Sequence, residues 1–110
     1  MKANVVHQKD AEFRDLDGGV ERRVLAHTPQ MMIAEVRFQA GSEGSAHTHP
    51  HAQNTYVKSG RFRFTVEDES VEVGSGDSLA FPPGVLHGTV CLEAGTLIDV
   101  FAPMREDFLK

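Results

Sequence analysis

The 110-residue sequence contains one cysteine, no tryptophan, one tyrosine and no long hydrophobic run. The lone Cys91 cannot form an internal disulfide, which excludes a secreted disulfide scaffold and favours a reducing, cytoplasmic location. The longest apolar runs, such as residues 31–34, are too short to span a membrane, and the N-terminus is too polar for a signal peptide. Eleven basic against sixteen acidic residues give a net charge of -5, so we expect no nucleic-acid-binding face.

Glycine and proline separate short stretches in which apolar and polar residues alternate, a pattern typical of strands. The clearest alternation lies in residues 61–67, where Phe62, Phe64 and Val66 share one face. Residues 41–45 are predicted to form a loop. Strands are predicted over residues 20–25, 31–38, 56–58, 61–67, 71–73, 78–81, 87–92 and 96–102, with one short helix over 103–109. This spacing predicts an all-β fold, a jelly-roll β-barrel with at most one short C-terminal helix.

The chain length predicts one domain over residues 1–110. We expect the barrel over about residues 20–103, preceded by an N-terminal arm (1–19) and followed by a short C-terminal segment (104–110). A domain of this size has a small core and gains stability from a second subunit. The sequence therefore predicts a homodimer, with residues 31–33 and the N-terminal strand supplying apolar contact surface.

Histidine is the residue in excess, with six in the chain and three of them within residues 47–51. On a strand, His47 and His49 project to the same face, and two imidazoles are a good start for a transition-metal site. His87 is the candidate third ligand, and Gln53 can add its amide oxygen. Such a donor set suits nickel, zinc, iron and manganese alike. The alternative is adventitious metal binding by a local histidine cluster.

The spacing around these residues resembles the two-part motif of the cupin superfamily. In the first part, Gly41, His47-x-His49, Gln53 and Gly60 follow one another at the family's intervals; in the second, Gly76, Pro82-x-Gly84 and His87 do so. The resemblance implies a cupin-type jelly roll that holds one metal ion inside the barrel. It places His47, His49 and His87 at the positions of the family's histidine ligands.

Two positions depart from the family pattern: Gln53 replaces the usual glutamate ligand, and Cys91 replaces the final asparagine. Four neutral ligands would leave the charge of the ion undiminished, which favours anionic ligands and Lewis-acid chemistry. Cys91 is interpreted as a small buried strand residue, because nothing in the sequence marks it as an activated thiolate. His51 follows Pro50, which is expected to interrupt the strand, so we place His51 beside the ligands or at the cavity rim.

Asp99 stands inside an otherwise apolar strand, so its carboxylate should be paired, protonated or functional. Phe101 shares the face of Asp99, and Arg105 follows shortly afterwards. A guanidinium at the mouth of the cavity can bind a substrate carboxylate through two hydrogen bonds. The alternative is a structural ion pair between Asp99 and Arg105.

The stretch His47-x-His49-Pro50-His51-x-Gln53, together with residues 99–109, resembles the KdgF family. Members of that family act on 4,5-unsaturated monouronates from pectin or alginate and promote conversion of the cyclic sugar acid to its linear ketonised form. The resemblance implies a small anionic sugar-acid substrate. It also implies a functional set made up of Gln53, Asp99, Phe101 and Arg105.

Two other classes of function remain open at this point. The first is different cupin metalloenzyme chemistry, such as a dioxygenase or another isomerase; oxygen uptake with a phenolic or diketone substrate would indicate the dioxygenase. The second is a binding protein without turnover, such as a sugar or metabolite sensor. Fold alone does not decide between them, because function resides in the site.

Overall fold

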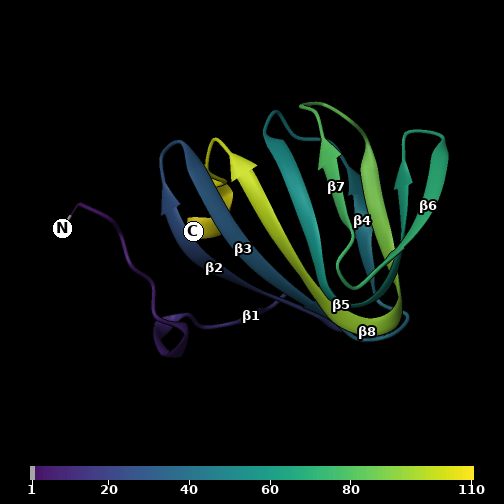
Figure 1. Ribbon diagram of the computed structural model, residues 1–110, viewed down its shortest axis with the longest axis horizontal. Coiled ribbons are helices and arrows are strands. Elements are labelled where there is room, and N and C mark those ends of the chain that lie inside the picture. The colour runs from purple at the N-terminus through teal and green to yellow at the C-terminus, as the bar shows by residue number, and fades with distance from the viewer. Residues whose placement is uncertain (1) are drawn as a thin grey trace.

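The computed structural model describes residues 2–110 and consists almost entirely of strands and turns (Figure 1), which confirms the predicted all-β fold. The strands are β1 (Arg14–Asp15), β2 (Val20–Thr28), β3 (Met31–Phe38), β4 (Glu43–His47), β5 (Ala52–Val66), β6 (Glu69–Gly74), β7 (Ser78–Phe81) and β8 (His87–Ala102). Two 3₁₀ helices accompany them, η1 (Gln8–Asp10) and η2 (Glu106–Leu109).

The two long strands β5 and β8 each contribute to both sheets of the barrel. The first half of β5 pairs with β7 and with the second half of β8, and β3, β2 and β1 extend this sheet. The second half of β5 pairs with β6 and with the first half of β8, which also pairs with β4. In Figure 1 the two sheets diverge upward from the bend shared by β5 and β8.

The prediction of separate strands on either side of residues 59–60 and of residues 93–95 was wrong. Each pair is one continuous strand, bent where the ladder between β5 and β8 shifts register. Gly60 has a φ of 85°, and a Cβ built on it would lie 2.6 Å from the carbonyl oxygen of Glu93. Only glycine allows the two backbones to approach so closely, so these positions bend the strands and do not end them.

The alternation predicted for residues 31–38 is confirmed in β3, whose inward side chains from Met32 to Phe38 are buried. Met32 is fully buried, so its expected contribution to a dimer surface was wrong. Met31, its neighbour, is 54% exposed, and the homodimer stays a prediction. Full burial of Phe62 stabilises the barrel interior by roughly 1.5–3 kcal/mol relative to an exposed side chain.

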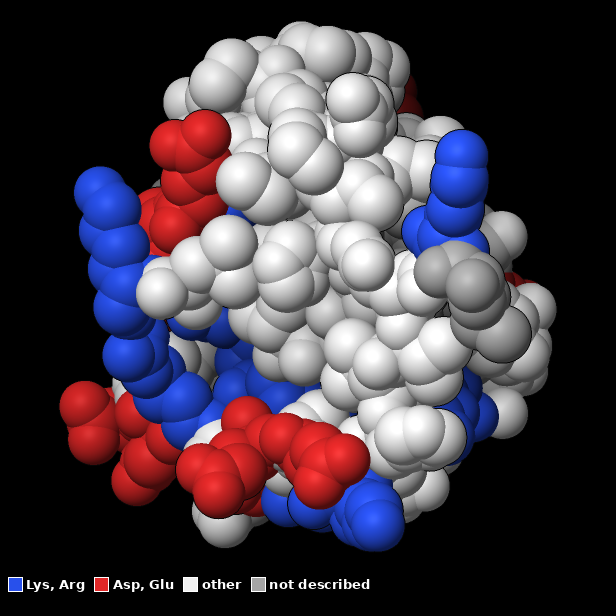
Figure 2. Space-filling view, turned by 90° about the vertical axis from the view of Figure 1, so that its left-hand side faces the viewer, with Lys and Arg blue, Asp and Glu red and all other residues white. Residues whose placement is uncertain are grey.

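The N-terminal arm lies against the outside of the first sheet. Phe13 is stacked under the guanidinium groups of Arg37 and Arg23, at 3.6 and 4.4 Å, and Arg14 donates a 2.7 Å hydrogen bond to the carbonyl oxygen of Lys110. On the face seen in Figure 2, basic and acidic side chains gather at the lower end and along the left and right margins, and the top and centre are largely uncharged.

The helix prediction needs correction at both ends of the chain. The C-terminal helix is only the four-residue η2, since Arg105 before it is extended, and η1 in the arm was not predicted. No helix within residues 2–110 has the length and apolarity that a membrane crossing requires.

Candidate active site

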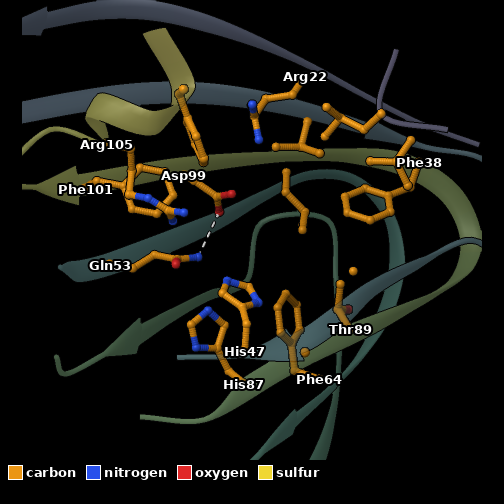
Figure 3. A pocket seen from close by; sticks show the side chains of 17 residues that line it. Arg22, Phe38, His47, Gln53, Phe64, His87, Thr89, Asp99, Phe101 and Arg105 are labelled. Atoms are coloured by element: carbon orange, nitrogen blue, oxygen red, sulfur yellow. Dashed lines mark hydrogen bonds between the residues drawn. The ribbon is translucent and has the colours of Figure 1, made fainter. Parts of the chain in front are cut away.

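A pocket of about 200 Å³ opens between the two sheets (Figure 3). This volume lies below the range of about 300–1,000 Å³ that is typical of drug-sized ligands, so the pocket suits a small molecule better than a polymer. Apolar core side chains form much of its wall. The polar side chains that line it include Arg22, His47, Gln53, His87, Asp99 and Arg105.

One side of the pocket holds a cluster of three histidines, as the sequence predicted. One potential ligand atom each from His47, His49 and His87 lies within 4.8 Å of the others. His47 ends β4 and is paired in the ladder with His87, which begins β8. His49 lies beyond the end of β4, so the loop and not strand alternation directs it to the cluster.

Backbone hydrogen bonds orient all three imidazoles in the same way. The Nδ1 atoms of His47, His49 and His87 lie 2.8, 3.0 and 2.9 Å from the carbonyl oxygens of Ser45, His51 and Val85. A carbonyl oxygen only accepts, so each Nδ1 carries a proton, and in the neutral tautomer that this selects the Nε2 lone pair points away from the carbonyl. Such fixing of the tautomer by a carbonyl is a recurrent feature of metal-binding histidines.

Two imidazole nitrogens of the cluster, Nε2 of His87 and Nε2 of His49, have no hydrogen-bond donor within residues 2–110 to accept from. Nε2 of His87 is buried and has no hydrogen-bond partner among the described residues. Nε2 of His49 lies 2.9 Å from Oε1 of Gln53, which brings two lone pairs together when His49 is neutral. Burial, and then the neighbouring His47 and His49, lower the pKa of His87, so this ring is neutral at physiological pH. The three imidazoles therefore fit a divalent metal ion, and the amide oxygen of Gln53 lies next to them.

Gln53 joins the histidine cluster to Asp99. Its amide nitrogen donates to Oγ1 of Thr55 at 2.9 Å and to Oδ1 of Asp99 at 3.4 Å, the dashed line in Figure 3. Thr55 also donates a 2.6 Å hydrogen bond to the same carboxylate oxygen. Burial raises the pKa of Asp99 from 3.8 to about 6, although these two hydrogen bonds oppose the shift. Asp99 can therefore both take up and release a proton near neutral pH.

The raised pKa of Asp99 predicts a stabilising substitution in metal-free protein. Above pH 6 the folded state holds a buried carboxylate that the unfolded state would solvate, so stability falls as the pH rises from about 4 to about 6. Asp99→Asn is expected to increase the free energy of unfolding by up to about 3 kcal/mol at about pH 8 and by little at about pH 4. Urea unfolding of both proteins in EDTA measures this difference, and a gain that does not vary with pH would contradict it.

Arg105 forms its ion pair with Asp107 and not with Asp99, so the alternative of a structural Asp99–Arg105 pair was wrong. Nε and Nη2 of Arg105 donate to the two carboxylate oxygens of Asp107 at 3.0 and 2.9 Å. The Arg105 side chain is 12% exposed and lies 5.1 Å from the ring of Phe101. Arg105 and Phe101 both line the pocket, near Asp99 (Figure 3).

Two residues of the site, Arg22 and Thr55, were not predicted from the sequence: Arg22 lines the pocket, and Thr55 is buried and hydrogen-bonded to Asp99. Each lies on the inward face of a strand, Thr55 between Gln53 and Val57, and Arg22 between Val20 and Val24. For Arg22, a charged side chain between two valines on the same face was the available signal, whereas Thr55 lies between a polar and an apolar residue.

His51 lies beside the cluster, whereas Cys91 lies in the apolar core. The ring of His51 is 5.4 Å from that of His49, and its carbonyl accepts from His49. Cys91 is a buried core residue, as expected, and burial raises the pKa of its thiol. Neither belongs to the group of three potential ligands.

Comparison with known proteins gives consistent matches. A family model described as the cupin domain matches residues 34–101. The pectin degradation protein KdgF of Dickeya dadantii is 34% identical over 102 residues, covering 91% of this chain and 93% of the relative. Among solved structures, an RmlC-like cupin from Shewanella frigidimarina has a TM-score of 0.91 at 37% identity, covering 98% and 99% of the two chains. KdgF from Halomonas sp. has a TM-score of 0.89 at 34% identity, covering 94% and 98%.

Proposed function

The chain belongs to the cupin family, and from this membership and the chemistry of the pocket we propose that it is a metal-dependent sugar-acid enzyme. Its proposed substrates are cyclic 4,5-unsaturated uronate monomers from pectin or alginate, which it converts to the linear ketonised form. The similarity to KdgF proteins and the small pocket with its few convergent polar side chains support this proposal.

His47, His49, His87 and Gln53 are the residues that would hold the metal. Four uncharged donor groups would leave a divalent ion its full charge, so the ion would supply Lewis-acid chemistry toward a hydroxyl or ring oxygen of the sugar. Carbonyl groups hold the three imidazoles in the ligand tautomer before a metal arrives. The site is therefore preorganised by the chain itself.

Asp99 is the residue proposed to move the proton. Ring opening breaks the bond between C1 and the ring oxygen and turns C1 into an aldehyde, with loss of the proton of the anomeric hydroxyl. Ketonisation turns C5 into a carbonyl and adds one proton at C4, so the reaction is an isomerisation without net gain or loss. With a pKa of about 6, Asp99 can accept the first proton and return it at C4.

The remaining residues bind and orient the sugar acid. Arg105 presents the free part of its guanidinium to the substrate carboxylate, and Phe101 forms an apolar wall against the ring. Because the ion pair with Asp107 and the contact with Phe101 hold Arg105 in place, little side-chain entropy is lost on binding.

Gln53 supplies the single observation that carries the proposal. Its amide oxygen faces the histidine cluster and its amide nitrogen faces Asp99, so one planar group joins the metal-binding and proton-transferring parts of the site. A glutamate at this position has no N–H group and could not donate the hydrogen bond that Asp99 accepts from Gln53.

The experiment that tests the proposal follows the ultraviolet absorbance of a 4,5-unsaturated uronate, which disappears when the double bond is lost. Protein loaded in turn with nickel, zinc, iron or manganese is expected to accelerate this loss, and EDTA-treated protein is not. If none of the four metals supports acceleration, the proposed function is wrong. Oxygen uptake recorded on the same samples would identify the dioxygenase alternative.

Gln53→Glu is expected to tighten metal binding and to reduce turnover by about 10-fold or more. The new carboxylate reduces the charge on the ion, removes both N–H donors and places a second negative group beside Asp99. Metal competition and initial rates measure the two effects. The control is Asn54→Asp, the analogous change at the next residue, which is exposed. Unchanged turnover in Gln53→Glu would contradict the role given to the amide.

A further inference from the structure

Arg22 and Arg105 come from opposite ends of the chain and meet at the pocket. In Figure 3 both lie on the side of the pocket opposite His47 and His87. Both guanidinium groups are stacked on the ring of Phe108, with their Cζ atoms 3.6 and 4.3 Å from its centroid. Phe108 in η2 therefore holds the two arginines near each other.

The charge of Arg105 is already balanced within the chain. Asp107 accepts from Nε and Nη2, so one fork of the guanidinium is occupied, and both N–H groups of Nη1 and one of Nη2 remain available. Arg105 and Asp107 together add no net charge to this side of the pocket. If this pair were the only contact, a substrate anion would find hydrogen-bond donors but no net positive charge to balance its own.

Arg22 provides that charge. It is half-buried, and among residues 2–110 no side chain or backbone group forms a hydrogen bond or ion pair with its guanidinium. Burial and the proximity of Arg105 lower its pKa, although Asp107 and Asp99 act in the opposite direction. A partly desolvated cation beside another arginine destabilises the folded chain unless an anion compensates it. Such uncompensated groups are concentrated at functional sites.

We propose that Arg22 is a second carboxylate-binding residue, which together with Arg105 forms a clamp for the carboxylate of the bound sugar acid. The net charge of the clamp, counting Asp107, is that of one cation and matches a monoanion. Two planar guanidinium groups can offer parallel N–H donors to one carboxylate. The identity of the anion as a sugar acid rests on the proposed function, whereas the preference for a carboxylate over an uncharged ester is a property of Arg22.

The test measures binding and needs no turnover. Metal-loaded protein is titrated calorimetrically with D-galacturonate, a saturated sugar acid, and with its uncharged methyl ester. Wild-type protein is expected to bind the acid more tightly, and Arg22→Gln to lose about 10- to 100-fold in affinity for the acid but little for the ester. Arg37→Gln is the matched control, since Arg37 is also stacked 3.6 Å from a phenylalanine ring but lies outside the pocket.

Three results would overturn the proposal. In the first, wild-type protein binds no D-galacturonate or binds it no more tightly than the ester. In the second, Arg22→Gln still binds the acid more tightly than the ester. In the third, Arg22→Gln loses the same affinity for both ligands. The last would make Arg22 a packing partner of Phe108. Arg22→Lys, which keeps the charge but not the fork, is expected to retain part of the preference, and it replaces Arg22→Gln if that variant does not fold. Acid binding that depends on Arg22, without turnover of the unsaturated uronate, would refute the proposed function only.

Discussion

Replacing His49 with alanine is expected to weaken divalent-metal binding by at least about 100-fold and to abolish turnover, because loss of a ligand costs more than loss of the groups that orient it. His49 is buried, its Nδ1 is bonded to the carbonyl of His51, and its Nε2 faces Oε1 of Gln53. Alanine removes one of four ligands and leaves the amide oxygen of Gln53 without its neighbour. Metal content after dialysis and the initial rate of absorbance loss measure the two effects.

His27→Ala is the matched control for this substitution. Nδ1 of His27 also lies near a backbone carbonyl, that of Leu25 at 3.2 Å, but the residue is outside the cluster. The control variant is expected to keep wild-type metal content and rate. Equal metal retention by the His49 and His27 variants would show that the cluster does not hold the ion.

Replacing Asp99 with asparagine is expected to reduce turnover by about 10²- to 10⁴-fold while the protein keeps its metal, because general acid–base catalysis contributes on this scale. Asparagine can still accept from Thr55 and Gln53 but cannot exchange a proton. The same variant is expected to gain stability in its metal-free form, as argued above. Greater stability with lower activity is the behaviour expected of a group retained for catalysis.

Glu35→Gln provides a comparison with another buried carboxylate. Glu35 is 6% exposed and pairs with Arg23 at 2.7 Å, but it points to the opposite side of β3 from the pocket-lining Val36. This variant is expected to lose stability and to keep the turnover of its folded fraction. Full activity in Asp99→Asn would remove Asp99 from the proposed mechanism.

The alternation within short stretches was predictable because it depends on neighbours in the chain. The buried faces of β3 and of the second half of β5 follow the period of two that the sequence shows. The bends of β5 and β8 were not predictable from the sequence. Gly60 has the signal of a strand end, and only the tertiary structure shows that it packs against the backbone of Glu93. A glycine in a turn and a glycine in a bend have the same local sequence signal.

In the candidate site too, some residues were predictable from the sequence and others were not. The sequence was enough to propose His47, His49, His87 and Gln53 as ligands, because their intervals, together with those of the surrounding glycines and Pro82, resemble the cupin motif. The tertiary structure decided which group pairs with Arg105, how Thr55 and Gln53 contact Asp99, and that Arg22 reaches the pocket. Apart from the ion pair of Arg105 with Asp107, these arrangements bring together segments that lie far apart in the sequence. They depend on strand register and on the packing of η2, which the free energy of the whole fold determines.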